Sequence, residues 1–230
     1  MNPDLAICIT TYNRAAILRD VLDELLALAG KHGVAVYVSD NNSSDGTETV
    51  LREMQTRYPL LFVRINDANL GFDANLERCI RMASARYVWT MADYNFLEPD
   101  ALEILLARIG RADYDVIMLN NHGRVRGIGS RVYTDPGALV ADVGWHVTLL
   151  DAMVWSRRII DSSRFVHYAG TVFAYYGVVM DYLATIGCHV WWEEKSLVRA
   201  VHPRKVSLWQ RDALDIWADK WPAAIFALPC

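Results

Sequence analysis

Residues 87–100 have the sequence YVWTMADYNFLEPD, and the prediction of the whole fold starts from this stretch. Its first five residues are apolar or β-forming and predict a short buried strand. Asp93-Tyr94-Asn95 follows almost at once, and Pro99 then predicts the start of a helix. An acid and an amide just beyond a strand lie where open α/β sheets bind ligands, and their oxygens suit Mg²⁺ or Mn²⁺. Asp and Asn are also common turn residues, so the neighbouring sequence must decide between a site and a turn.

Three similar units precede this stretch. Buried strands are predicted at residues 5–10, 34–39 and 60–65, and each is followed by a polar cluster and an amphipathic helical pattern. The alternation predicts an α/β protein with a mainly parallel sheet flanked by helices, and a site along the carboxyl edge of that sheet. The polar clusters are Thr11-Tyr12-Asn13-Arg14, Asp40-Asn41-Asn42-Ser43-Ser44-Asp45-Gly46-Thr47 and Asn66-Asp67-Ala68-Asn69-Leu70-Gly71.

The composition excludes several other classes of protein. The 230 residues are 53% hydrophobic and 22% charged, with a net charge of −4, so nothing indicates a nucleic-acid-binding surface. No GxGxxG or GxxxxGK[ST] motif supports a dinucleotide-binding or P-loop protein. The four widely spaced cysteines favour reduced thiols, and neither a signal peptide nor a membrane-spanning stretch is visible. We therefore expect a cytoplasmic protein.

The polar clusters, together with the Asp93-Tyr94-Asn95 motif, resemble those of the family 2 glycosyltransferases of the GT-A fold. The resemblance covers the first part of the chain and includes the segment Asn69-Leu70-Gly71-Phe72 with Ala74-Asn75. It implies an inverting transferase that uses a nucleotide-diphosphate sugar and usually a divalent metal. We expect a single domain with a C-terminal helical appendage: a nucleotide-sugar-binding half at 1–110, an acceptor-binding half at 111–205 and a helix or tail at 206–230.

The resemblance also assigns the donor-binding residues. In the family, the segment after the first strand and the acid that ends the second strand hold the nucleoside, and these positions are Thr11, Tyr12 and Asp40 here. The chemistry agrees, because a buried carboxylate can accept from a base N–H and an aromatic ring can cover a base or ribose. The expected donor-binding set is Thr11, Tyr12, Arg14, Asp40, Asn69 and Asp93.

The Asp93-Tyr94-Asn95 motif corresponds to the Asp-x-Asp of the family. The last acid of that motif is the usual metal ligand, and Asn95 occupies its position. The amide keeps an oxygen but lacks the charge, so a weaker metal site is expected. Some members supply a further ligand from a late histidine, for which His202 is suitable. The expected ligands of Mg²⁺ or Mn²⁺ are therefore Asp93, Asn95 and His202.

The usual catalytic base of the family is missing. It is the acid of a Glu-Asp pair at the start of a helix, and this chain has Ala174-Tyr175 at that position. The base must therefore come from another part of the chain. Residues 165–167 match a short Phe-x-His signature of the subset that includes the abequosyltransferases of O-antigen assembly.

His167 and Asp151 are the two candidates for the base. A helix is expected to begin near Tyr168, and a helix N-terminus would keep His167 neutral and able to accept a proton. Asp151 follows an apolar run that enters the acceptor half, and a buried carboxylate there could serve instead. A third interpretation is that His167 only caps the helix or packs against it.

Residues 207–221 predict a C-terminal helix with several apolar side chains roughly on one side. Arg204, Lys205 and Arg211 lie nearby, which would allow contact with an anionic bilayer that carries a lipid-linked acceptor, on the inner face of the membrane. Packing on the catalytic domain, or against a second subunit in a homo-oligomer, fits the pattern equally well.

The sequence thus predicts an enzyme that moves a hexosyl or deoxyhexosyl group from a nucleotide sugar to a glycan or lipid-linked acceptor. Bacterial surface polysaccharide, or another glycan, is the expected product. The alternative from a different functional class is a protein that is not an active enzyme: a catalytically degenerate sugar-nucleotide-binding or assembly module. Asn95 and the missing Glu-Asp pair suggest it. A sugar-nucleotide pyrophosphorylase is disfavoured because its Gly-rich, Arg- and Lys-bearing signature after the first strand is absent.

Overall fold

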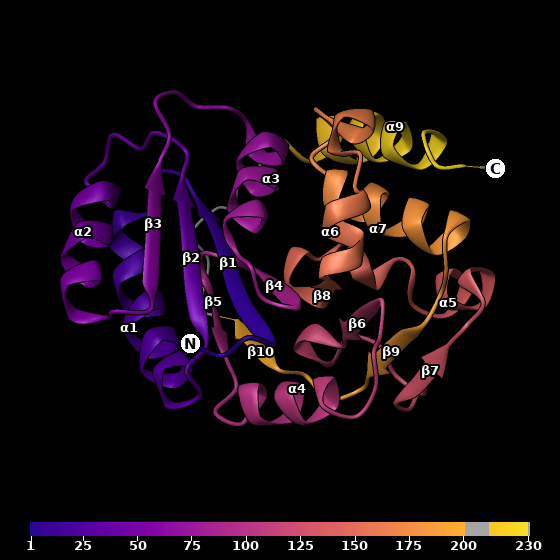
Figure 1. Cartoon of the computed structure of the whole chain (residues 1–230). Coiled ribbons are helices and arrows are strands. Elements are labelled where there is room, and N and C mark those ends of the chain that lie inside the picture. Colours follow the sequence, from indigo (N-terminus) through magenta and orange to yellow (C-terminus); the bar gives the residue numbers. More distant parts are fainter. Residues whose placement is uncertain (201–211, 230) are drawn as a thin grey trace.

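A computed structural model describes residues 1–200 and 212–229 of the chain. Its strands are β1 (Leu5–Thr11), β2 (Ala35–Asp40), β3 (Leu61–Ile65), β4 (Tyr87–Ala92), β5 (Asn95–Leu97), β6 (Val116–Leu119), β7 (Arg131–Tyr133), β8 (Met153–Ser156), β9 (Val190–Glu193) and β10 (Val198–Ala200). Eight of them form one sheet in the order β3-β2-β1-β4-β8-β6-β9-β7, and β5 pairs with β10 in a separate ribbon (Figure 1). The first four strands are parallel, whereas β8 runs antiparallel to both of its neighbours, β4 and β6.

Helices cover both faces of this sheet (Figure 1). The α-helices are α1 (Ala15–Lys31), α2 (Thr47–Arg57), α3 (Phe72–Met82), α4 (Ala101–Ile109), α5 (Pro136–Val143), α6 (Arg157–Ser162), α7 (Ala174–Thr185) and α9 (Trp221–Phe226). Four 3₁₀ turns, η1 (Asn121–Gly123), η2 (His146–Thr148), η3 (Leu150–Ala152) and η4 (Phe165–Tyr168), and a π-helical turn, η5 (Asp215–Lys220), complete the described elements.

Two apolar cores result from the alternation of strand side chains. In β1, Leu5, Ile7 and Ile9 face the core closed by α1, α2 and α4. Ala6 and Cys8 face the other core, which is closed by α3, α5, α6 and α7. Burial on both faces explains why the strands are nearly continuous apolar runs in the sequence. The predicted fold class is therefore confirmed, with a mostly parallel sheet flanked by helices and C-terminal helices on a single domain.

Residues 111–205 differ from the prediction in two respects. The short strands β7, β8 and β10 were not predicted, as β5 was not in the preceding part of the chain, and the expectation that a helix begins near Tyr168 is wrong. The segment there is the 3₁₀ turn η4, and α7 begins only at Ala174. Asp73 of α3 explains the delay, because its carboxylate accepts backbone N–H bonds from Gly170, Val172 and Ala174 and so holds the intervening loop in a non-helical path.

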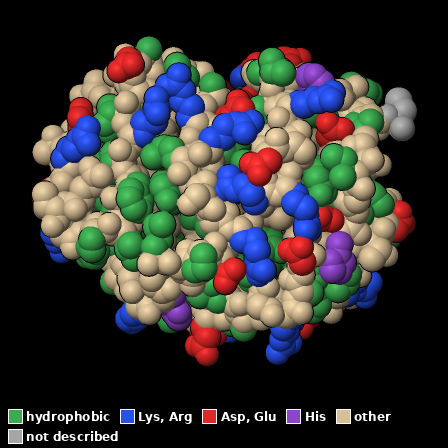
Figure 2. Space-filling view, in the orientation of Figure 1, with side chains coloured by type: hydrophobic (Ala, Val, Ile, Leu, Met, Phe, Trp, Pro, Cys, Tyr) green, Lys and Arg blue, Asp and Glu red, His purple; other side chains and the backbone are tan. Residues whose placement is uncertain are grey.

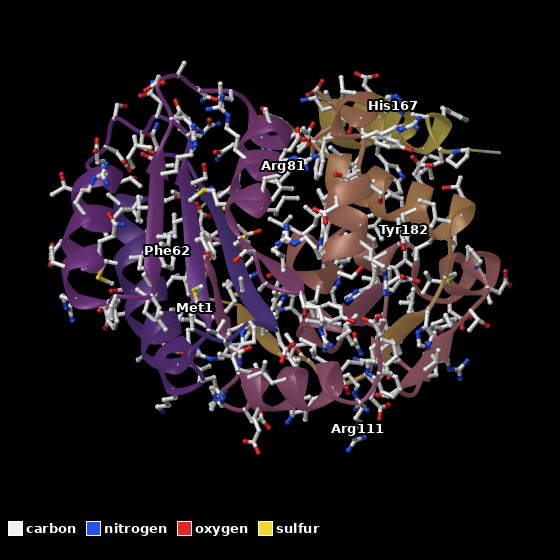
Figure 3. The ribbon with its side chains drawn as sticks, in the orientation of Figure 1. Met1, Phe62, Arg81, Arg111, His167 and Tyr182 are labelled. Atoms are coloured by element: carbon white, nitrogen blue, oxygen red, sulfur yellow. The ribbon has the colours of Figure 1, made fainter. Side chains whose placement is uncertain are left out.

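Arg81 joins α3 to the end of α6 at the surface. Its guanidinium donates to the Ile160 carbonyl at 3.3 Å and to Ser163 Oγ at 3.2 Å, which links α3 to the end of α6. Figure 3 labels Arg81 at this junction, and Figure 2 shows several Lys and Arg side chains along the middle of the same face. The junction is therefore polar at its surface and apolar beneath, where α3 and α6 share a core.

The described part of the C-terminal tail packs on the domain. The ring centroid of Trp221 lies 4.9 Å from that of Phe173 and 4.9 Å from that of Tyr176, so α9 lies against α7. This agrees with the packing alternative for the tail. Residues 201–211, which include the first part of the expected C-terminal helix, lie outside the described residues. None of the helices within 1–200 and 212–229 has the length and apolar character that a membrane span requires.

Candidate active site

The parallel strands bring Thr11, Asp40 and Asp93 to one edge of the sheet. Thr11 pairs with Asp40 in the register of β1 and β2, and Asp93 directly follows Ala92, which pairs with Thr10. The side chains of Thr11, Asp40 and Asp93 are all buried at this carboxyl edge. Buried polar groups at the carboxyl ends of parallel strands are typical of ligand sites in open α/β sheets.

Asp93 is held from two sides. The Thr11 hydroxyl donates a 2.8 Å hydrogen bond to Oδ2 of Asp93, and Nε of Arg14 lies 3.7 Å from Oδ1. Burial raises the pKa of the Asp93 carboxyl to about 6, although the Thr11 hydrogen bond and the Arg14 charge act in the opposite direction. The end of β1 and the start of α1 thus fix a carboxylate that is largely charged at neutral pH.

Asn95 contacts a carboxylate from a distant part of the chain. Its Nδ2 donates to Oδ2 of Asp151, which lies 56 residues further on. Asp151 precedes β8, and because β8 is antiparallel to β4, Asp151 returns to the sheet edge at which β4 ends. Burial raises the pKa of the Asp151 carboxyl, and the hydrogen bond from Asn95 lowers it. A carboxylate therefore lies directly beside the amide that replaces the usual acid.

The loops after β1 and β2 are joined to each other. The backbone N–H of Asn13 donates to Ser43 Oγ at 2.8 Å, and the N–H of Ser44 donates to Asn13 Oδ1 at 2.8 Å. Ser43 in turn donates its hydroxyl and its N–H to the Asp40 carboxylate. Asn13 adopts a φ of 54°, a left-handed conformation that Asn tolerates. The side chain of Tyr12 is 40% exposed beside this frame and is free to cover a ligand.

Asn69 is positioned by Asn41. The Nδ2 of Asn41 donates to Asn69 Oδ1 at 2.9 Å and to the Gly71 carbonyl at 3.2 Å. Its Oδ1 accepts from the Leu70 N–H at 2.9 Å and from Asn66 Nδ2 at 3.3 Å. One buried amide therefore ties the loop between β3 and α3 to the end of β2, and the expected donor-binding residues all belong to this connected edge.

His167 does not join this group. It belongs to η4, its side chain is exposed, and Figure 3 labels it at the periphery of the molecule, near the C-terminal helices. Its backbone N–H donates to the Arg164 carbonyl, as expected inside a turn rather than before a helix N-terminus. Among the described residues, no side-chain hydrogen bond or ion pair links His167 to Asp93 or Asp151. His202, the other expected histidine, lies outside the described residues.

Several residues around Asp151 were not predicted from the sequence. Besides burial, the pKa of Asp151 responds to His122 and Asn121, which both lower it. Burial raises the pKa of Tyr94 to about 12, and the charge of Asp151 adds to that rise. Tyr175 is fully buried, and Asp151 likewise contributes to its raised pKa. Their position in the sequence could have indicated them, because Asn121 and His122 follow β6 in the same way as the expected donor-binding residues follow β1 and β2.

The residues present fit a cation that is shared with a ligand. Within the described part of the chain, no group of three or more His, Cys, Asp or Glu side chains is placed to hold a metal. Asp93 and Asn95 nevertheless offer oxygens, and Asp151 adds negative charge beside Asn95. Mg²⁺ is usually bound by one or two carboxylates plus substrate phosphates rather than by a complete protein cage.

Curated relatives include a protein named as an abequosyltransferase. The chain is 25% identical over 223 aligned residues to abequosyltransferase RfbV of Salmonella typhimurium, an alignment that covers 84% of this chain and 65% of that protein. The chain thus spans slightly less than two thirds of the length of this relative. A glycosyltransferase homologue of Mycoplasma pneumoniae is 23% identical over 57% of this chain and 45% of its own length.

Solved structures share the fold. Staphylococcus aureus TarS in complex with UDP-GlcNAc has a TM-score of 0.70 at 14% identity, covering 88% of this chain and 60% of TarS. Glucosyl-3-phosphoglycerate synthase of Mycobacterium tuberculosis, with Mn²⁺, UDP and phosphoglyceric acid, has a TM-score of 0.68 at 16% identity. The match covers 99% of this chain and 80% of the synthase. Mannosyltransferase PcManGT of Pyrobaculum calidifontis, with GDP-Man and Mn²⁺, has a TM-score of 0.65 at 14% identity, covering 98% and 65%.

The sequence profile described as glycosyl transferase family 2 matches residues 6–158, which is well over half of the chain. That range contains the four parallel strands, the loops that follow them and the Asn95–Asp151 contact. The profile and the shared GT-A fold agree with the arrangement of the carboxyl edge, and the chain belongs to glycosyl transferase family 2.

Proposed function

We propose that the protein transfers a sugar from a nucleotide-diphosphate sugar to an acceptor hydroxyl, with inversion at the anomeric carbon. The observation that carries the proposal is Asp93, a buried carboxylate fixed by Thr11 and Arg14 at the carboxyl edge. A rigid charged group at that edge can orient a polyhydroxy donor and its diphosphate without reorganising during the reaction. Membership of the transferase family supports the same reaction class.

The donor would lie across the ends of β1 to β4. Tyr12, Asp40 and Asn69 would bind the nucleoside, since their loops are locked together by hydrogen bonds. Arg14 and Asp93 would face the diphosphate end. The structural neighbours that contain UDP, UDP-GlcNAc or GDP-Man support a nucleotide sugar as the donor.

A divalent cation would be held by oxygens of Asp93 and Asn95. When bound, Mg²⁺ or Mn²⁺ supplies positive charge that stabilises the departing diphosphate. Asn95 can offer its Oδ1 because its Nδ2 already donates to Asp151, which fixes the orientation of the amide. Asp151 supplies part of the negative charge that Asn95 lacks. The role of His202 as a third ligand is still a prediction.

For the proton of the acceptor hydroxyl, the geometry favours Asp151 over His167. Asp151 is buried beside Asn95, and burial raises its pKa, which makes its carboxylate a better proton acceptor than an exposed one. His167 is exposed and lies in a 3₁₀ turn, which makes it the less favoured of the two candidate bases. Inversion requires the base to act from the side of the sugar opposite the leaving group.

The cellular role is proposed from the relatives. Similarity to an abequosyltransferase supports deoxyhexosyl or hexosyl transfer to a glycan or lipid-linked acceptor in surface polysaccharide assembly. Work on a lipid-linked acceptor would place the protein on the cytoplasmic face of the membrane. Contact of the tail with that membrane, and association into a homo-oligomer, are further proposals of the same kind.

Calorimetry and turnover together test this function. The full chain is titrated with UDP, GDP, CDP and dTDP sugars with and without Mn²⁺, and release of the nucleoside diphosphate is followed in the same samples. Binding with slow hydrolysis or transfer supports the enzyme. Asn95 and the missing Glu-Asp pair favour the alternative, a sugar-nucleotide-binding module, and tight binding without any turnover would support that module instead.

A further inference from the structure

Asn121 is a fully buried amide without a well-formed hydrogen bond. Its side chain has no solvent exposure, and neither Oδ1 nor Nδ2 forms a hydrogen bond of normal length and angle with a described residue. A buried amide normally has partners, because leaving it unpaired costs free energy. Such a group in a folded protein calls for an explanation, and binding of a ligand is one that can be tested.

The neighbouring asparagine shows the contrast. Asn120 is buried too, but its Nδ2 donates to the carbonyls of Val125 at 2.9 Å and Glu194 at 3.0 Å. Its Oδ1 accepts from the Val125 N–H at 2.9 Å. Asn120 therefore has a complete structural role, and Asn121, which follows it directly, has none in hydrogen bonding.

The position of Asn121 links it to the donor site. It begins η1 two positions after Leu119, the last residue of β6, and β6 is paired with β8, which Asp151 of η3 precedes. Burial raises the pKa of the Asp151 carboxyl, and the side-chain amide of Asn121 is one of the hydrogen-bonding neighbours that lower it. Asp151 in turn accepts from Asn95, which follows β4. The chain of neighbours therefore runs from the expected diphosphate site to Asn121.

We propose that Asn121 binds a hydroxyl group of the transferred sugar, beside Asp151. This rests on the proposed function, because the sugar of the donor is bonded to the diphosphate expected at Asp93 and Asn95. β8 is the strand next to β4, so a sugar attached to a diphosphate at the end of β4 would lie on the side of Asp151 and Asn121. An amide offers both a donor and an acceptor, which matches a sugar hydroxyl, and a carboxylate is a second acceptor.

Tyr94 provides the route for the ligand. The charge of Asp151 contributes to the raised pKa of Tyr94, after burial, so the ring lies close to this carboxylate. Tyr94 is nevertheless 38% exposed. Rotation of a partly exposed side chain is fast, so movement of Tyr94 would open a path toward Asp151 for the ligand.

The test compares two neighbouring variants, Asn121→Leu and Asn120→Leu. Calorimetry on the full chain measures the affinities for UDP, GDP, CDP and dTDP and for UDP-glucose, GDP-mannose, CDP-glucose and dTDP-glucose. The variants are compared on one nucleoside diphosphate and its sugar nucleotide. The pair chosen is the one for which the wild type binds the sugar nucleotide more tightly than the nucleoside diphosphate. Thermal unfolding is recorded for each variant, because Leu keeps the branching and the heavy-atom count of Asn but is bulkier and has no polar atoms.

Asn121→Leu should keep the affinity for the diphosphate within about twofold and bind the sugar nucleotide about tenfold more weakly. Its unfolding temperature should equal or exceed that of the wild type, whereas Asn120→Leu should unfold at a lower temperature. Equal sugar-nucleotide affinity in wild type and Asn121→Leu would overturn the proposal. Equal loss of both ligands with a lowered unfolding temperature would also overturn it, since that marks a structural role. A wild type that binds none of the probes would remove the proposed function itself.

Discussion

The amide of Asn95 donates a hydrogen bond to the carboxylate of Asp151, and both side chains are buried at the carboxyl edge of the sheet. The motif after β4 therefore has its second carboxylate supplied from η3 instead of from its own third position. The site can therefore carry the same charge as an Asp-x-Asp motif, but the second carboxylate is bonded to the Asn95 amide and does not occupy the third position of the motif. This relationship has direct consequences for stability and for metal affinity.

Asn95→Asp should lower stability in the absence of a metal. It places two buried carboxylates in contact, which raises the pKa of one of them and costs on the order of 3 kcal/mol. Mn²⁺ should then bind more tightly than to the wild type and raise the unfolding temperature more. The double variant Asn95→Asp with Asp151→Asn is the control, because it restores an amide–carboxylate pair and should recover most of the stability. An identical Mn²⁺ shift in wild type and Asn95→Asp would argue against a cation at this residue.

Asp93→Asn should reduce transfer by a factor of about 10² or more, because the variant loses the charge that orients the donor. Thr11 can still donate to the new amide oxygen, so the fold should be intact. Steady-state kinetics with the donor found by calorimetry measures the loss, and circular dichroism checks the fold. Near-normal kcat/KM in this variant would remove Asp93 from the centre of the site.

The same variant should change how stability depends on pH. The pKa of Asp93 is raised by burial from 3.8 to about 6, so between these values the folded protein holds a proton that the unfolded chain releases. Stability should therefore fall as pH rises through this window, by up to about 3 kcal/mol, and the loss should persist at higher pH. Asp93→Asn lacks this titration. Its stability advantage over the wild type, measured by urea unfolding, should grow between pH 4 and pH 6.

The donor edge could be predicted from the sequence because its geometry is local. A buried run followed by a polar cluster, repeated in parallel units, places Thr11, Asp40 and Asp93 together without any knowledge of side-chain contacts. The Asn95–Asp151 contact could not be predicted in this way. It depends on the four-residue strand β8, which is antiparallel to its neighbours and too short to show a clear period.

The start of α7 was predicted wrongly for a different physical reason. The residues from Tyr168 onward are compatible with a helix, and sequence periodicity alone extends it backwards. The structure stops it with a tertiary contact, since Asp73 accepts the N–H groups of Gly170, Val172 and Ala174 from about a hundred positions earlier in the chain. Val172 also adopts a φ of 66°, which no helix allows. Because α7 begins only at Ala174, His167 lies in an exposed turn and not at a helix N-terminus.

Asn41→Ala should lower both stability and donor affinity. The variant removes an amide that holds Asn69, Leu70 and Gly71, and loss of these bonds should cost about 3 kcal/mol. Asn41→Asp is a graded comparison, because it keeps the acceptor for the Leu70 N–H but loses the two donated bonds. Donor affinity by calorimetry should therefore rank wild type, then Asn41→Asp, then Asn41→Ala. Equal donor affinity in all three would show that the loop carrying Asn69 does not bind the donor.

Asp40→Ala should weaken donor binding with a smaller effect on the chemical step. Its carboxylate is fully buried and accepts from Ser43, so part of the loss will come from the loop. Ser43→Ala separates the two contributions, because it removes the hydroxyl that bonds Asp40 and Asn13 but keeps the Asp40 carboxylate and the N–H bond that it accepts. The KM for the donor should rise more in Asp40→Ala than in Ser43→Ala. A defect confined to kcat, with donor affinity intact, would contradict a nucleoside-binding role.

The identity of the base can be decided by comparing Asp151→Asn with His167→Ala. Asp151→Asn keeps the shape of a buried side chain but cannot accept a proton, so transfer should fall by about 10² or more while the donor stays bound. The control for the lost charge is donor affinity, which should change by much less than the rate. His167→Ala should retain its rate, because the side chain is exposed in η4 and no hydrogen bond or ion pair links it to Asp93 or Asp151 among the described residues. A pH–rate profile completes the test: the acidic limb of the wild type should be present in His167→Ala and absent from the residual activity of Asp151→Asn. If His167→Ala loses transfer while Asp151→Asn retains it, the base is His167, and the exposed turn must then move toward the acceptor during the reaction.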